Sequence, residues 1–131
     1  MKKTPLLNVE LSEVIAGLGH GDMLVIGDAG LPIPLDVRRI DLALTRNVPG
    51  FVETLRVVLS EMQVQSAMVA EETGQKSPHI LDAIKQLLPD TPIEDVTHTL
   101  LKAYTEDAVA VVRTGEFTPY ANIILVAGVV F

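Results

Sequence analysis

The chain has 131 residues, a formal net charge of −7 and no cysteine. This length predicts one domain, residues 1–131, which can bury an adequate core without disulfides. The lack of cysteine excludes a disulfide scaffold, a thiolate zinc site and a cysteine nucleophile. The acidic balance, the scattered basic residues and an aromatic content of only 4% argue against a nucleic-acid partner.

No segment has the pattern of a secretory signal or a membrane span. Two lysines open the chain, but Asn8 and Glu10 interrupt the apolar stretch that follows them. The longest apolar run, residues 123–131, is too short to cross a bilayer as a helix. We therefore expect a cytoplasmic protein with no membrane partner.

The N-terminal third predicts a helix, a strand, a loop and a second strand. Asn8 can cap a helix whose apolar face ends near Leu18, and Gly19 occupies the position of a C-cap glycine. Residues 23–26 predict a short buried strand, and the loop at 27–34 contains two glycines and two prolines. Residues 39–44 alternate polar and apolar, which predicts a strand with one exposed or partnered face.

The middle of the chain alternates helices and strands. After a turn at 47–50, residues 51–62 have the spacing of an amphipathic helix, and residues 64–70 predict a strand. The pair Ser77-Pro78 predicts the cap and first turn of a helix that ends at Pro89. Residues 93–96 predict a short strand, and Thr97 can cap the next helix.

The C-terminal part predicts two buried strands, at 108–112 and 123–131, joined by a polar loop. Strands that alternate with helices favour an α/β fold. We expect a single layered α/β/α domain with a mixed, partly parallel sheet.

His20 and Asp28 flank the predicted strand at 23–26. A carboxylate after the carboxyl end of a strand lies where ligand sites of α/β proteins gather. The simpler interpretations are a histidine at a helix C-terminus and a turn-forming aspartate. Because the strand separates the two side chains, they would share a site only if different subunits supplied them.

Two further groups of side chains are candidates for binding. His98 and Lys102 are four residues apart and so lie on one helix face. Two cations at this spacing indicate a shared anionic or hydroxyl-rich ligand, or simply an exposed face. Tyr120 and Asn122 follow Pro119 and could bind a ligand or only stabilise a turn.

Several reaction classes lack their motifs. The glycines at 17–21 follow a helix and precede a strand, which is the wrong order for a dinucleotide site. No serine-hydrolase elbow or histidine pair for zinc is present. Asp28 and Glu116 could form a glycosidase pair, but the chain leaves little room for a long cleft. The sequence predicts no metal and no cofactor.

The motifs together are similar to the D-ribose pyranase family, whose close relatives are the L-fucose mutarotases. The resemblance covers nearly the whole chain and is weakest at residues 73–95. The matching segments are Leu18–Asp22, Asp28–Pro32, Arg39–Asp41 and, above all, Arg113–Asn122. The segment Asp28–Pro32 is more similar to the ribose branch than to the fucose branch.

The resemblance implies a site and a reaction. His20 would be the catalytic acid/base, and the sugar would be bound by Asp28, His98, Lys102, Tyr120, Ala121 and Asn122. The implied enzyme interconverts the pyranose and furanose forms of D-ribose by ring opening, during ribose uptake and use. That reaction removes a proton from the anomeric hydroxyl and delivers one to the ring oxygen, and histidine suits both steps near neutral pH. It needs no cofactor.

The resemblance also implies a ring-like homodecamer with sites between subunits. A mean hydropathy of +0.36 and an apolar C-terminal residue, Phe131, are compatible with an oligomer. The alternatives are an L-fucose mutarotase-like enzyme and a pentose-binding module without catalytic activity.

Overall fold

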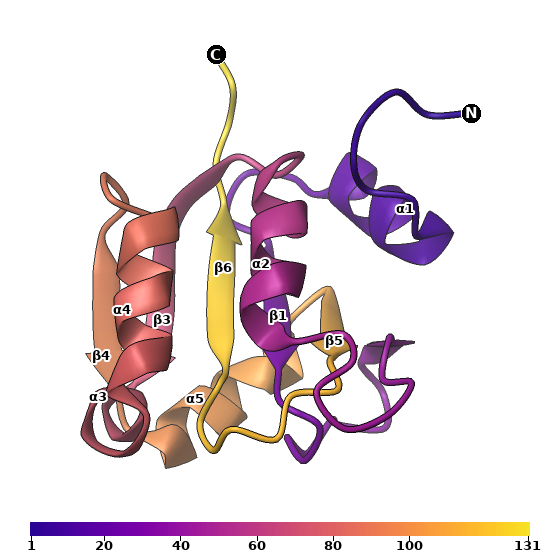
Figure 1. Ribbon diagram of the computed structural model, residues 1–131. Helices are drawn as coiled ribbons and strands as arrows, with labels where there is room; N and C mark the ends of the chain where they lie inside the picture. The colour runs from indigo at the N-terminus through magenta and orange to yellow at the C-terminus, as the bar shows by residue number, and fades with distance from the viewer.

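The computed structural model describes all residues, 1–131, and contains one six-stranded sheet between helices (Figure 1). The strand order is β2-β5-β1-β6-β3-β4. β6 pairs antiparallel with β1 and β3, and the other pairs are parallel, which confirms the mixed sheet. The strands are β1 (Met23–Gly27), β2 (Arg38–Asp41), β3 (Val64–Ala70), β4 (Ile93–Val96), β5 (Ala110–Arg113) and β6 (Ile123–Ala127).

Helices cover both faces of the sheet, as the layered α/β/α prediction requires. The helices are α1 (Val9–Gly17), α2 (Phe51–Leu59), α3 (Glu71–Lys76), α4 (Pro78–Leu87) and α5 (His98–Tyr104), and a 3-10 turn at Thr105–Asp107 follows α5. Apolar side chains of α1, α2 and α4 form the larger core cluster with one face of the sheet. α5 and the loop after β1 form the smaller cluster with the other face.

Successive side chains of the central strands point to opposite faces of the sheet and so contribute to both core clusters. In β1, Leu24 and Ile26 belong to the larger cluster and Val25 to the smaller one, and all three are fully buried. Each such side chain contributes about 1.5–3 kcal/mol relative to an exposed one. A strand buried on both faces therefore reads as a continuous apolar run, which is why β1 and β6 were recognisable in the sequence.

The structure corrects several expected element boundaries. Asn8 does cap α1, since its side-chain oxygen accepts a hydrogen bond from the Leu11 amide at 2.8 Å. The helix ends at Gly17 with Leu18 as its C-cap, and Gly19 follows at the position of a cap glycine but lacks the left-handed conformation of one. Ser77 precedes α4 without capping it through its side chain. β2 ends at Asp41, and α3 was not predicted at all.

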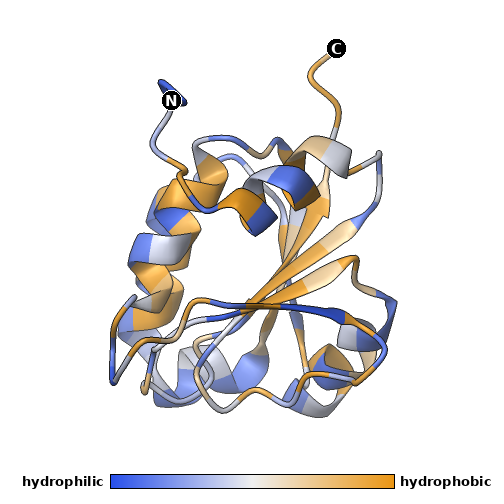
Figure 2. Ribbon diagram, turned by 90° about the vertical axis from the view of Figure 1, so that its right-hand side faces the viewer, coloured by the Kyte–Doolittle hydropathy of each residue, from blue (hydrophilic) through white to orange (hydrophobic).

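The predicted strand at 123–131 ends early, at Ala127. The Gly128 amide donates to the Gln63 carbonyl at 2.9 Å, and the last residues then leave the sheet. Val130 is 85% exposed and Phe131 is fully exposed, and Figure 2 shows this apolar tail extending away from the body of the molecule.

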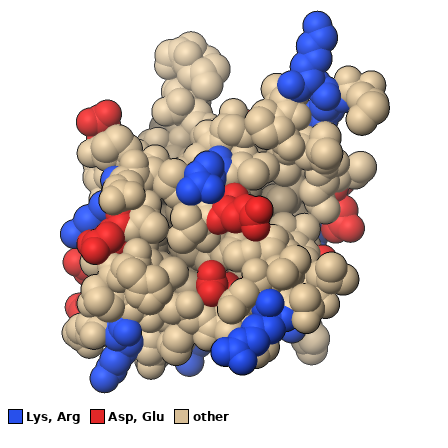
Figure 3. Space-filling view, in the orientation of Figure 1, with Lys and Arg blue, Asp and Glu red and all other residues tan.

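The helices are short, and charges of both signs are mixed on one face of the molecule. None of the helices combines the length and apolarity needed to cross a membrane. On the face shown in Figure 3, acidic and basic side chains are dispersed among neutral ones and form no stripe of one sign.

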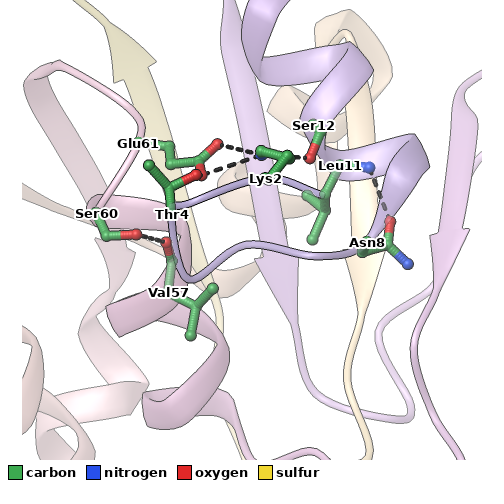
Figure 4. A network of polar contacts seen from close by, with 8 residues as sticks. All are labelled: Lys2, Thr4, Asn8, Leu11, Ser12, Val57, Ser60 and Glu61. Carbon is green, nitrogen blue, oxygen red and sulfur yellow. Dashed lines mark hydrogen bonds and ion pairs between the residues drawn. The ribbon is translucent and has the colours of Figure 1, made fainter.

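A polar network ties the N-terminal segment to the end of α2 (Figure 4). The Lys2 ammonium donates to the Glu61 carboxylate at 3.0 Å and to the Ser12 hydroxyl at 2.9 Å. The Thr4 hydroxyl also donates to Glu61. The Thr4 hydrogen bond, followed by the contacts with Lys2, holds the pKa of the Glu61 carboxyl below its ordinary value of 4.5.

We predict that this network makes stability depend on pH in the acid range. A carboxyl whose pKa is lowered by folding stabilises the fold above its unfolded pKa, and that contribution disappears as the pH falls through the folded pKa. Glu61→Gln should therefore unfold at a lower urea concentration than the wild type at pH 7, and the difference should vanish well below pH 4.5. Urea midpoints measured across this range check it. Glu94→Gln, at an exposed position in β4, is the control, and an equal effect of both substitutions would contradict the prediction.

Candidate functional site

The direction of the strands places several polar side chains at one edge of the sheet. All strands except β6 point the same way, so their carboxyl ends meet at this edge, where β6 begins. We call it the carboxyl edge; it lies at the bottom of Figure 1. Asp28 follows β1, Glu72 follows β3 and His98 follows β4, whereas Asn122 directly precedes β6.

The loop at 114–122 crosses the end of β1, because β1 lies between β5 and β6 in the sheet. Thr114 donates its amide and its hydroxyl to the Gly27 carbonyl, at 3.0 and 2.8 Å. The Ala29 amide donates to the Glu116 carbonyl at 2.9 Å. The crossing loop is thereby fixed on the residues around Asp28.

Asn122 and Asp28 form the central contact of this edge. The Asn122 side-chain oxygen accepts the Asp28 amide at 2.8 Å, and its nitrogen donates to the Asp28 carboxylate at 3.1 Å. Asn122 is fully buried and Asp28 half-buried. Gly27 allows this close approach, since a Cβ there would lie 2.5 Å from Leu31 and 3.1 Å from the Asn122 oxygen. Asn122 thus stabilises another loop rather than its own turn.

Tyr120 lies in a left-handed backbone conformation, with a φ of 61°. Two buried hydroxyls from the α3 region hold this turn: Thr73 donates to the Tyr120 carbonyl and Ser77 to the Pro119 carbonyl, each at 2.7 Å. The Tyr120 carbonyl also accepts the Asn122 amide at 2.9 Å, whereas the Ser77 hydroxyl is the protein donor to the Pro119 carbonyl. Ala121, fully buried, continues the turn into Asn122.

His98 stands edge-on to the Tyr120 ring, with centroids 5.1 Å apart and an interplanar angle of 84°. The Glu72 carboxylate accepts the His98 backbone amide with both oxygens, at 3.1 Å each. The ring nitrogen Nδ1 of His98 is buried and has no hydrogen-bond partner within the chain. Buried polar atoms are normally paired, so this unpaired nitrogen is unusual.

Lys102 lies one turn after His98 on α5 and is half-buried. It lines a shallow depression of about 320 Å³ together with Pro32, Ile33 and Pro34, from the loop after β1. Asp28 lines a different depression, of about 380 Å³, beside Arg113, Glu116 and Thr118. Lys102 therefore shares the carboxyl edge with Asp28 but not its immediate surroundings.

Arg113 and Glu116, whose roles the sequence left open, support the surrounding loops. The Arg113 guanidinium donates to the Ala29 carbonyl at 3.0 Å and pairs with Asp41 at 3.2 Å. The Glu116 carboxylate accepts the Phe51 amide at 3.0 Å, which caps α2 in place of Gly50. Glu116 thus has a capping role, which leaves its pairing with Asp28 as in a glycosidase without support.

His20 lies at the opposite edge of the sheet. β1 has five residues, so it spans roughly 16 Å at about 3.3 Å per residue. His20 precedes this strand and Asp28 follows it, so the strand separates them, as the sequence predicted. The His20 ring is exposed, and its Nε2 lies 2.7 Å from the side-chain oxygen of Gln65. It lines a depression of about 510 Å³ that also includes Glu61 and Phe131.

The residues that hold the candidate side chains in place were not identifiable from the sequence. Glu72 was visible as a carboxylate at the end of β3. The contacts of Thr73, Ser77 and Gln65 were not predictable, because their partners are distant in the chain. No three histidine, aspartate or glutamate side chains gather closely enough to hold a metal ion. That the protein needs no cofactor stays a prediction.

Known proteins with the same chain length and fold relate this arrangement to one family. The model of the RbsD / FucU transport protein family matches residues 1–130. D-ribose pyranases of Chloroflexus aggregans and Coprothermobacter proteolyticus are 69% and 56% identical over the full length of both chains.

Solved structures agree with this relationship. Bacillus subtilis RbsD, complexed with D-ribose, superposes with a TM-score of 0.97 at 45% identity over both full chains. A fucose mutarotase from Streptococcus pneumoniae, in complex with L-fucose, superposes with a TM-score of 0.85 at 27% identity, also over both full chains. The chain belongs to the RbsD / FucU family.

Proposed function

We propose that the protein is a D-ribose pyranase, an isomerase that interconverts the pyranose and furanose forms of D-ribose. The observation that carries this proposal is the meeting of Asp28, His98, Tyr120 and Asn122 at the carboxyl edge, in a chain that matches D-ribose pyranases from end to end. A pentose presents several hydroxyls, and carboxylate, imidazole, phenol and amide groups can each donate to or accept from them.

Each side chain has a defined part in sugar binding. In this proposal the free lone pairs of Asp28 and the ring of His98 bind hydroxyls of the sugar. Tyr120 adds a further polar contact, and so does Lys102 from the neighbouring depression. Ala121 contributes through its backbone. Because Asn122 already bonds Asp28 with both ends of its amide, it acts on the sugar partly by orienting that carboxylate.

His20 is the acid/base in this proposal. Its ring removes the proton of the anomeric hydroxyl while the bond between C1 and the ring oxygen breaks, and the imidazolium so formed gives a proton to the ring oxygen. This gives the open aldehyde. Attack by the other hydroxyl on C1, with loss of its proton and protonation of the carbonyl oxygen, closes the furanose. Atoms and charge balance without an oxidant or a cofactor.

The site is assembled from two chains. His20 and the sugar-binding residues lie at opposite edges of one subunit, farther apart than a single pentose can bridge, so a second copy must supply one of them. The exposed apolar tail of Val130 and Phe131, beside the depression that contains His20, supports a contact between copies there. A ring-like homodecamer in the cytoplasm, as the family resemblance implies, is the assembly we propose.

We predict that the protein accelerates exchange between the pyranose and furanose signals of D-ribose in saturation-transfer NMR. General acid/base catalysis typically supplies ~10²–10⁴-fold, so exchange should rise in proportion to protein concentration. L-fucose in the same experiment tests the mutarotase-like alternative. Ribose binding with exchange at the buffer rate would overturn the enzyme and leave the pentose-binding module.

His20→Ala should reduce this exchange to near the buffer rate, because it removes the acid/base that provides ~10²–10⁴-fold. The thermal midpoint should change little, since the ring is exposed. His79→Ala, at an exposed position in the first turn of α4, is the matched control and should keep full activity. Exchange that survives in His20→Ala would transfer the acid/base role to His98.

Mixing two inactive variants tests the two-chain site. His20→Ala and Asp28→Ala, dissociated together and reassembled, should regain activity at about a quarter of sites under random assembly, because each such site combines an intact His20 with an intact Asp28. Each variant reassembled alone is the control. If one chain builds a whole site, no mixing ratio restores exchange.

A further inference from the structure

The His20 ring has one side-chain partner in the structure, Gln65. The distance from its Nε2 to the Gln65 side-chain oxygen is 2.7 Å, well within hydrogen-bond range. Gln65 is itself exposed and belongs to β3, far from His20 in the sequence. Two exposed side chains stay this close only if the backbone holds both of them in place.

A β-bulge sets the direction of the Gln65 side chain. The register between β3 and β6 shifts between Val64 and Ser66, which leaves Gln65 as the extra residue. Bulges re-aim side chains and are common beside active sites. Gly128 packs against Gln65, since a Cβ at that glycine would lie 3.1 Å from the Gln65 Cβ. The base of the Gln65 side chain is thus fixed at the end of the sheet.

The turn that carries His20 is fixed against the same end of β6. The Gly19 amide donates to the Asp22 carboxylate at 2.7 Å, and Gly21 adopts a φ of 87°, which favours glycine. The Gly21 amide donates to the Ala127 carbonyl at 2.9 Å, and the Ala127 amide donates to the Asp22 carbonyl at 2.8 Å. Backbone hydrogen bonds therefore hold the turn that carries His20.

We propose that Gln65 is the positioning residue of His20: it accepts a hydrogen bond from Nε2–H and leaves Nδ1 as the nitrogen that exchanges protons with the sugar. An amide oxygen can only accept, so the nitrogen facing it must carry the proton, and the lone pair of the neutral ring is then on Nδ1. The inference deepens the proposed function and rests on it.

The uncharged amide suits this role. It accepts from both the neutral and the charged ring, so the orientation is retained while His20 takes up and releases the proton. Charged groups around the depression are Asp22 on the same turn, Glu61, which is engaged by Lys2, and the C-terminal carboxylate of Phe131. None of them forms an ion pair with the His20 ring.

The tautomer can be measured without any sugar. In ¹⁵N-labelled protein, the two-bond ¹⁵N–¹H pattern of the neutral His20 ring should indicate Nε2–H, and Gln65→Met should shift it toward a mixture of tautomers. The chain has three histidines, and the signals lost in His20→Ala identify the one in question. A ring that carries its proton on Nδ1 in the wild type, or an unchanged tautomer in Gln65→Met, would overturn the inference.

Kinetic measurements then distinguish a role of Gln65 in positioning His20 from a purely structural role. Gln65→Met should lower kcat for ribose exchange about 10-fold, a fraction of the ~10²–10⁴-fold that acid/base catalysis supplies, with KM little changed. Gln65→Glu keeps an acceptor and should recover most of the rate, with the midpoint of the pH–rate profile moved to higher pH, because a carboxylate favours the charged ring. Gln86→Met, at an exposed position in α4, is the control and should behave as the wild type.

The two proposals fail differently. Unaltered kcat in Gln65→Met, or a pH–rate profile that Gln65→Glu does not move, would overturn the role of Gln65 while ribose exchange persists. A wild type that has the Nε2–H tautomer, loses it in Gln65→Met and yet shows no exchange would support the Gln65 contact and overturn the pyranase function.

Discussion

β6 runs against its neighbours in the middle of the sheet, and both candidate regions depend on this one reversal. At its start, Asn122 enters the carboxyl edge beside Asp28; at its end, Ala127 bonds to the turn that carries His20. If β6 were parallel to its neighbours, its start would lie at the edge with His20 and its end at the carboxyl edge. Since β6 is buried on both faces, any shift in its register would also move apolar side chains out of the core.

The carboxyl edge is held by polar contacts that are almost fully paired. Asn122 uses both ends of its amide, Thr73 and Ser77 pair the carbonyls of the Tyr120 turn, and Glu72 pairs the His98 amide. α3 thus serves as the support of the site, although none of its side chains belongs to the group that we assign to the sugar. The Nδ1 of His98 is the exception, because it is buried and has no hydrogen-bond partner.

The two edges differ in how their side chains are positioned. Buried hydrogen bonds fix Asp28 and His98, whereas His20 and Gln65 are exposed and depend on a bulge, a glycine turn and the end of β6. In the proposed function His20 would be incomplete as an acid/base within one subunit, because its ring is exposed there. Contact with the carboxyl edge of a second copy would supply both the cover and the sugar-binding groups.

The local sequence determined the elements whose signals are short-range. The apolar runs of β1 and β6, the caps Asn8 and Thr97, and the motifs that resemble the D-ribose pyranase family were all readable, because propensity, capping and burial act over a few residues. These signals also predicted the mixed sheet and the separation of His20 from Asp28.

Only the tertiary structure decided which distant groups meet. The pairing of Asn122 with Asp28 follows from the strand order, which places β1 beneath the loop between β5 and β6. The contact between Gln65 and His20 follows from a one-residue bulge that no local sequence pattern predicts. Ser77 occupies the predicted N-cap position of α4, but its hydroxyl bonds to the distant Pro119 carbonyl instead of capping the helix. The strand expected at 123–131 ends at Ala127, because the Gly128 amide bonds to the Gln63 carbonyl. In both places a hydrogen-bond partner distant in the chain overrules the local preference of the residue.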